Sequence, residues 1–165
     1  MGIGRADTFD RYWGSEEDAM LNFSYPVTLI REKDAGAYTV RFRDLPEAIT
    51  SGADRREALE QAADCLEEAI ANRITMRMDI PAPSAARANQ PLAPVPPPMA
   101  AKLALYLAMK EAGVSNTALA RRLGCDEKEI RRMLDPRHPT KLPRVQAALR
   151  ILGKRLVIGM AEHAA

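Results

Sequence analysis

The sequence is poor in cysteine and histidine, and this scarcity excludes several classes of site. It has two cysteines and two histidines in 165 residues. Cys65 and Cys125 lie far apart and show no CxxC spacing, so they predict neither a disulfide scaffold nor a zinc site. We expect two reduced, structural thiols, no metal and no cofactor.

Long apolar runs are also missing. No apolar stretch approaches the ~20 residues needed to cross a membrane, and no signal peptide precedes the first expected strand. We therefore expect a cytoplasmic protein that makes no membrane contact. The apolar fraction of 47% and the charged fraction of 28% are those of an ordinary globular protein, with one domain or two small ones in 165 residues.

The residues of common hydrolytic sites are absent as well. Two-metal cleavage of phosphodiesters needs several carboxylates that converge from central strands, and the first expected strand, residues 25–30, contains none. Asp44 and Glu47 fall in a connecting segment, and neither His138 nor His163 lies beside a nucleophilic Ser or Cys in a defined turn. The sequence predicts a binding protein with no catalytic residues, not an enzyme.

What the sequence does have is an uneven distribution of charge. From Met99 onward there are 13 Lys/Arg and 6 Asp/Glu, a net charge of +7, and before it there are 11 and 16, a net charge of −5; together they give the +2 of the whole chain. A basic half is typical of the part that meets nucleic acid, and an acidic half either avoids nucleic acid or meets a basic protein.

The acidic half predicts a small sheet covered by one helix. Residues 25–31 (YPVTLIR) and 38–42 (YTVRF) are rich in β-formers and flank the turn residues KDAG, which indicates a hairpin, and residues 48–51 add a third strand. Asp54 and Glu57 then form a capping box at the start of a helix. The apolar stripe expected to cover the sheet consists of Leu59, Ala62, Ala63, Leu66, Ala69 and Ile70.

Proline divides the chain. Seven of its twelve prolines lie between residues 80 and 98, which excludes a helix interior or a central strand and indicates an extended linker over residues 81–98, with an edge strand near residues 92–95 as an alternative. Residues 1–22 show no clear period. We interpret them as a loosely ordered N-terminal extension; Trp13 as an anchor for a partner and Met20 as an alternative start of translation are further hypotheses.

The basic half is organised around residues 116–134, NTALARRLGCDEKEIRRML. Two helical patterns, residues 117–123 and 127–134, flank Gly124. A small residue at Ala120 allows a close helix crossing, Gly124 supplies the turn, and Ile130 fills the space between the helices. This spacing is typical of a DNA-binding helix-turn-helix.

The outward face of the second helix carries cations suited to a phosphate-lined groove. Asp126 and Glu129 are expected to form a capping box at its start. The alternative is a solvated helix in which Glu127 and Arg131 form an exposed ion pair. The residues expected to contact DNA are Lys128, Arg131 and Arg132 for bases or phosphates, Asn116, Thr117 and Arg137 for the backbone, and Glu127 on the same exposed face.

Flanking helices at residues 102–110 and about 142–152 complete a four-helix core. The tail, residues 155–160 (RLVIGM), predicts a short strand with no partner in its own helical domain. Such an edge most simply pairs with its copy in a second subunit through Leu156, Val157 and Ile158, which predicts a homo-dimer or higher homo-oligomer.

The order of these parts resembles the HicB family of antitoxins. The segments DLPEAIT, EAL…A…L…AI and IPAPS occur together and in order between residues 23 and 160, followed by the helix-turn-helix and RLVIG. The resemblance implies an α+β protein in which a partial RNase H-like βββα(β) domain, residues 23–80, binds and blocks a HicA-type mRNA-cleaving toxin. It also implies that residues 99–165 form a DNA-binding domain that represses the operon of both proteins. Residues 1–22 fall outside the family pattern.

A toxin that cleaves RNA has to present a basic surface, which an acidic module can cover. The acidic residues that we expect to bind the toxin are Asp44, Glu47, Glu60, Asp64, Glu67 and Glu68. The alternative function is a stand-alone helix-turn-helix transcription regulator whose N-terminal domain senses a small ligand.

Overall fold

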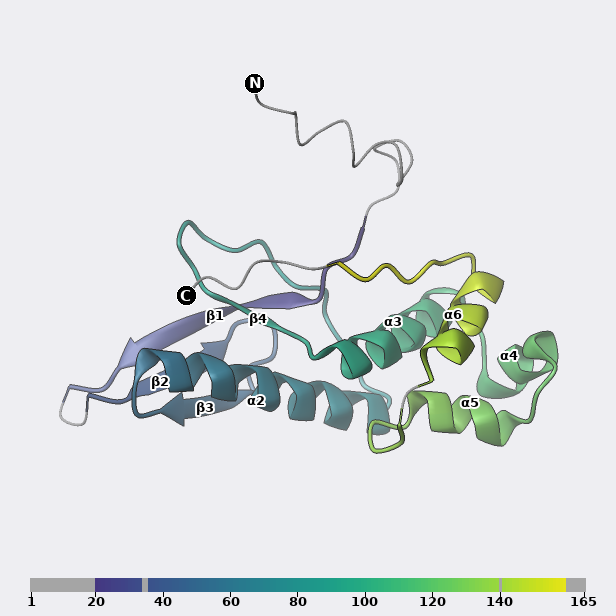
Figure 1. Cartoon of the computed structure of the whole chain (residues 1–165), viewed down its shortest axis with the longest axis horizontal. Helices are drawn as coiled ribbons and strands as arrows, with labels where there is room; N and C mark the ends of the chain where they lie inside the picture. The colour runs from purple at the N-terminus through teal and green to yellow at the C-terminus, as the bar shows by residue number, and fades with distance from the viewer. Residues whose placement is uncertain (1–19, 34–35, 140, 160–165) are drawn as a thin grey trace, which may run out of the picture.

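The computed structural model describes residues 20–33, 36–139 and 141–159 (Figure 1). Within these ranges the first part of the chain forms a sheet and one long helix, and the second part is helical. This confirms the predicted α+β class. The N-terminal extension lies outside the described residues up to position 19, and Trp13 is therefore not described.

The sheet has four antiparallel strands in the order β3-β2-β1-β4. They are β1 (Ser24–Arg31), β2 (Tyr38–Phe42), β3 (Ile49–Gly52) and β4 (Leu92–Pro94). The first three form the predicted meander, and the register pairs Leu29 with Val40 and Val27 with Phe42. Because side chains alternate between the two faces of a strand, these residues share the face that packs on the core.

Helix α2 (Arg55–Thr75) covers that face. The predicted cap is present: the Asp54 carboxylate accepts a hydrogen bond from Glu57 N at 2.9 Å, and Glu57 accepts one from Ala53 N at 2.8 Å. The buried face of α2 consists of Ala58, Ala62, Leu66, Ala69, Ile70 and Ile74, while Leu59 and Ala63 of the predicted stripe are only half-buried.

Gly52 explains how closely β3 and α2 approach each other. It is buried, and a Cβ atom at this position would lie 2.3 Å from the backbone nitrogen of Ala58. No L-amino-acid side chain fits there without a backbone shift. The glycine thus lets α2 begin directly against the edge strand of the sheet.

The proline-rich stretch contributes to two elements. Its predicted edge strand is β4, which pairs with β1, and helix α3 (Pro97–Glu111) begins inside it, several residues earlier than the expected start at residue 102. Proline is well tolerated in the first turn of a helix because its fixed backbone angle is already helical and no N–H partner is needed there.

Helix α3 lies between the sheet-and-helix part and the remaining helices (Figure 1). It contributes Met99, Leu103 and Tyr106 to the core under the sheet. From its other side it contributes residues to the second core, which are Ala101, Leu105, Ala108 and Met109. Tyr106 also donates a hydrogen bond from Oη to the Met78 carbonyl at 2.7 Å. One helix is therefore part of both hydrophobic cores.

The second core is closed by α4 (Asn116–Leu123), α5 (Glu127–Leu134) and α6 (Leu142–Ile151). Its buried residues from these helices are Leu119, Ala120, Ile130, Met133, Val145, Ala148 and Leu149. This is the four-helix arrangement that the apolar periodicity predicts.

The expected terminal strand is not formed in the single chain. Residues 154–159 have no strand pairing, and Met160 lies outside the described residues. Leu156 packs on the second core, whereas Ile158 is 70% exposed. The structure contains one chain, whereas the predicted strand would pair with the same strand of a second copy. The pairing of the two tails therefore stays a prediction.

Candidate functional site

Helices α4 and α5 are joined by a tight turn at the predicted positions. The side chain of Ser115 caps α4 by accepting a hydrogen bond from Ala118 N at 3.2 Å. Gly124 ends the helix in the left-handed region, with φ of +66°, which a residue with a side chain adopts at a cost. Ala120 is 4% exposed at the crossing, and Ile130 is fully buried between the helices. These three residues therefore lie where the sequence placed them, at the helix crossing, in the turn and between the helices.

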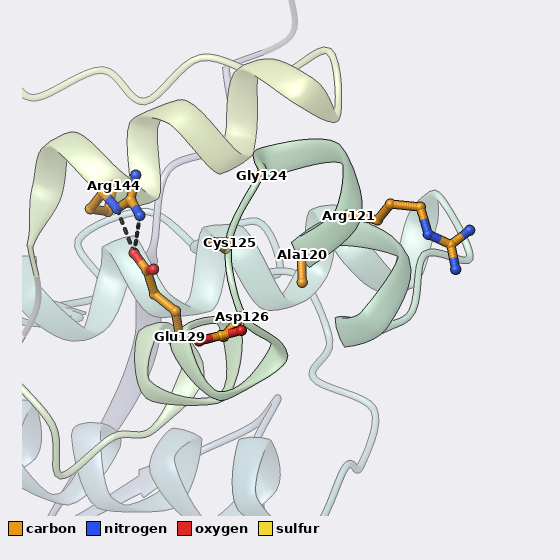
Figure 2. A pocket seen from close by; sticks show the side chains of 7 residues that line it. All are labelled: Ala120, Arg121, Gly124, Cys125, Asp126, Glu129 and Arg144. Atoms are coloured by element: carbon orange, nitrogen blue, oxygen red, sulfur yellow. Dashed lines mark hydrogen bonds and ion pairs between the residues drawn. The ribbon is translucent and has the colours of Figure 1, made fainter.

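The predicted capping box of α5 is wrong. Asp126 is the residue before the helix, but its side chain makes no capping hydrogen bond. Glu129 instead forms an ion pair with the guanidinium of Arg144, in the first turn of α6 (Figure 2). An available tertiary partner replaced the local one, and the pair fixes α6 against the start of α5.

The outward face of α5 presents the expected cations. Lys128, Arg131 and Arg132 are exposed, and so is Arg137 in the loop after the helix. On α4, Thr117 is exposed and Asn116 is half-buried. The first helix, α4, carries Asn116 and Thr117, the second helix, α5, carries Lys128, Arg131 and Arg132, and the loop after α5 carries Arg137.

Glu127 and Arg131 form the exposed pair that the alternative interpretation expects. The distance from Arg131 Nη2 to Glu127 Oε2 is 3.2 Å, and 63% of the Arg131 side chain is exposed. Such a pair contributes only about 0.2–0.5 kcal/mol. It does not prevent the guanidinium from turning to a phosphate or a base.

Two further cations were missed by the sequence reasoning. Arg121 and Arg122, in the last turn of α4, are both exposed. Arg121 lines an open depression beside the turn, and Figure 2 shows its guanidinium pointing away from the Arg144–Glu129 pair. The signal was the pair of arginines in the last turn before Gly124, which a search limited to the second helix overlooks. The depression is lined by Ala120, Arg121, Gly124, Cys125, Asp126, Glu129 and Arg144.

The sequence reasoning also missed Lys102, which is buried in α3 and 2% exposed. Its Nζ donates a hydrogen bond to the His138 carbonyl at 2.8 Å, and the Met133 carbonyl lies 3.5 Å away. Burial lowers the pKa of this amine, and the nearby Asp135 carboxylate acts in the opposite direction. No pattern in the sequence marks a lysine on the apolar side of a helix.

The acidic surface of the first half lies on α2. Glu60, Asp64 and Glu68 are exposed and Glu67 is half-buried. Burial raises the pKa of the Glu67 carboxyl, and the neighbouring carboxylates of Asp64 and Glu68 raise it further. This mutual repulsion makes the surface favourable for a cationic partner.

Asp44 and Glu47 are used within the chain. Asp44 Oδ2 accepts hydrogen bonds from Ser84 N at 3.0 Å and Ser84 Oγ at 2.9 Å. Glu47 pairs with Arg73, at the end of α2. These two carboxylates hold the connection between β2 and β3 in place, while Glu60, Asp64, Glu67 and Glu68 lie together on one helix.

The described residues were also searched for a metal site and for a membrane-spanning helix. Among them, no three His, Cys, Asp or Glu side chains are grouped so that they could hold a metal ion. In the same ranges no helix combines the length and the apolar character required to span a bilayer. The cysteines are both half-buried, and burial raises the pKa of each thiol.

Comparison with known proteins gives a consistent family match. A family model described as HicB_like antitoxin of bacterial toxin-antitoxin system matches residues 24–104. The protein named Antitoxin HicB 2 of Photorhabdus laumondii is 39% identical over 135 residues, which cover 82% of this chain and 94% of the relative. Antitoxin HicB of Escherichia coli K12 is 38% identical over 136 residues, covering 82% and 98%, and Antitoxin HicB of Pseudomonas fluorescens is 31% identical over 139 residues, covering 84% and 94%.

Proposed function

Because the chain belongs to the family of HicB-like antitoxins of bacterial toxin-antitoxin systems, we propose that it neutralises a HicA-type mRNA-cleaving toxin by direct binding and represses its own operon. Both activities are binding, and neither requires catalysis by this chain. We place both in the cytoplasm, where such a toxin meets mRNA.

Toxin binding is assigned to the sheet-and-helix half, residues 23–80 together with β4. The observation that supports this is the group of Glu60, Asp64, Glu67 and Glu68 on one helix. Burial raises the pKa of Glu67, and repulsion from the Asp64 and Glu68 carboxylates raises it further. A basic surface that binds RNA would relieve this repulsion, and charge complementarity would speed the encounter.

Operator binding is assigned to residues 99–165. The observation that carries this assignment is the exposed cationic face of α5, with Lys128, Arg131 and Arg132 turned away from a core that holds Ile130 and Met133. A two-fold dimer would place two such helices in successive major grooves ~34 Å apart. The tail residues Val157 and Ile158 are our candidates for the dimer contact, and Leu156 supports them from the second core.

The test combines two measurements on the full chain. The chain is co-expressed with the small basic protein encoded by the neighbouring gene, and growth and co-purification are recorded. The purified chain is then titrated against overlapping duplexes from the DNA upstream of its own gene. We expect restored growth, a stable complex, and one duplex that shifts at much lower protein concentration than the others.

Reciprocal variants separate the two activities. The Asp64→Asn, Glu67→Gln, Glu68→Gln triple variant should weaken the toxin complex and keep the gel shift. The Arg131, Arg132 double alanine variant should lose the gel shift and keep the toxin complex. A melting temperature that rises with small metabolites, with no response to the neighbouring protein, would instead support a ligand-sensing transcription regulator.

A further inference from the structure

Lys102 occupies an unusual place for a charged residue. It lies in α3 between Ala101, which packs in the second core, and Leu103, which packs in the first. Only 2% of the residue is exposed. Lysine is almost never fully buried unless its ammonium group is paired, because an isolated charge loses its hydration on burial. The role of Lys102 therefore depends on the groups that its ammonium group bonds.

Both partners are backbone carbonyls, one in the last turn of α5 and one in the loop after it. Met133 is in the last turn of that helix, where carbonyl groups lack an intrahelical partner and the helix dipole favours a cation. His138 lies in the loop that follows. That loop is closed by two bonds to Asp135, from His138 N to the carbonyl at 3.1 Å and from Arg137 N to the carboxylate at 2.9 Å.

We propose that Lys102 is the positioning residue of the DNA-contacting surface: it ties the end of α5 and the loop that carries Arg137 to α3. The inference rests on the proposed operator binding. The α4–α5 crossing depends on Ala120 and Ile130 and does not involve Lys102, so loss of the ammonium leaves the motif folded. The end of α5 and Arg137 then lose their fixed placement against the phosphates.

The experiment compares Lys102→Met with Leu103→Val in the full chain. Methionine keeps an unbranched side chain, one atom shorter than that of lysine, and removes the charge and the donors. The matched control removes one methylene from the next residue, Leu103, which is fully buried in the first core and has no hydrogen-bonding group in its side chain. Binding to the selected upstream duplex is measured by fluorescence anisotropy at several salt concentrations, well below the melting temperature of each variant.

We expect Lys102→Met to bind about tenfold more weakly and its salt slope to fall by about one, as for the loss of one phosphate contact. We expect Leu103→Val to bind within about twofold of the wild type. Lys102→Arg, which keeps a cationic donor at this position, should recover most of the affinity. Should Lys102→Met fail to fold, Lys102→Leu, which also has neither charge nor donor, replaces it with the same expectation.

Amide hydrogen exchange gives a readout that does not depend on DNA. The N–H groups of Arg137 and His138 should exchange faster in Lys102→Met and remain unchanged in Leu103→Val. Equal affinity losses in both variants would overturn the proposal, because the effect would then follow stability alone; wild-type affinity in Lys102→Met would also overturn it. A wild-type chain that shifts no duplex removes the operator function itself, and the proposal with it.

Discussion

Arg73 and Glu47 form a two-point ion pair that joins the end of α2 to the connection between β2 and β3. Arg73 Nε lies 2.5 Å from Glu47 Oε1, and Nη2 lies 3.0 Å from Oε2. Arg73 also donates a hydrogen bond from Nη1 to the Asp79 carbonyl at 2.6 Å, and the Asp79 carboxylate pairs with Lys110 of α3. This series of contacts connects the sheet to the helix that both cores share.

The first prediction concerns the contribution of the Glu47–Arg73 pair to stability. Hydrogen bonds from Arg73 lower the pKa of Glu47. The stability that this carboxylate contributes is therefore present above its unfolded pKa and is lost as the pH falls through its lower folded pKa. Since 42% of the Glu47 side chain is exposed, screening limits the cost of Glu47→Gln to about 1 kcal/mol near neutral pH.

Urea unfolding of the wild type and Glu47→Gln at neutral and acidic pH measures this effect. Glu111→Gln is the control, because its pair with Lys154 is exposed, at 66% and 47%, and should contribute less than about 0.5 kcal/mol. A Glu47→Gln cost that stays the same down to acidic pH would mean that the carboxylate charge is not its source.

The second prediction concerns the acidic face of α2. Burial and then the charges of Asp64 and Glu68 raise the pKa of Glu67. A carboxyl with a raised folded pKa destabilises the fold above that pKa, and this penalty disappears below its unfolded pKa. Glu67→Gln should therefore increase stability near neutral pH by about 0.2–0.5 kcal/mol and weaken the toxin complex. Gln61→Glu, on the same helix, is the opposite change at an exposed position.

Thermal unfolding measures the change in stability. Titration with the protein encoded by the neighbouring gene measures the change in toxin affinity. A variant that is more stable and binds the toxin less tightly indicates a surface whose repulsion is relieved by the partner. Unchanged toxin affinity in Glu67→Gln and in the triple variant described above would place the interface elsewhere on this half.

The third prediction concerns Arg131 and Arg132. Each alanine substitution should cost about 1–3 kcal/mol of operator affinity if the side chain contacts a base, or lower the salt slope by about one if it contacts a phosphate. The control is the Arg31, Arg41 double alanine variant, which removes the same charge from exposed positions on β1 and β2. Anisotropy titrations over a range of salt distinguish the two kinds of contact, and equal losses in both double variants would point to net charge alone.

The fourth prediction concerns assembly. Ile158 is 70% exposed at the end of the described tail, whereas Leu156 packs on the second core. If the proposed oligomer forms through the tail, Ile158→Lys should give a smaller species and leave the melting temperature of the single chain unchanged. Ile30→Lys makes the same change at an isoleucine that is 43% exposed on β1. Light scattering after size exclusion measures the mass, and the same mass for all three proteins would exclude the tail as the contact.

Local patterns were sufficient for most of the fold. The alternation in residues 38–42 located β2, the pair Asp54 and Glu57 located the start of α2, and the spacing of Ala120, Gly124 and Ile130 located α4 and α5. Each of these signals acts within one or two turns or one strand, so the chain carries it without reference to the rest of the molecule. The outward position of Arg131 and Arg132 follows from the same period.

The sequence by itself determined most of the elements, their order and the separation of acidic and basic halves. Only the tertiary structure decided which polar groups meet. Glu129 pairs with Arg144 of α6 and does not cap its own helix. Asp44 accepts a hydrogen bond from Ser84, Glu47 pairs with Arg73, and Lys102 donates to the His138 carbonyl in the loop after α5. The reason is physical. A helical or strand period fixes the face on which a residue lies, but a charged side chain pairs with whatever group folding brings within hydrogen-bond distance, however far away it is in the sequence.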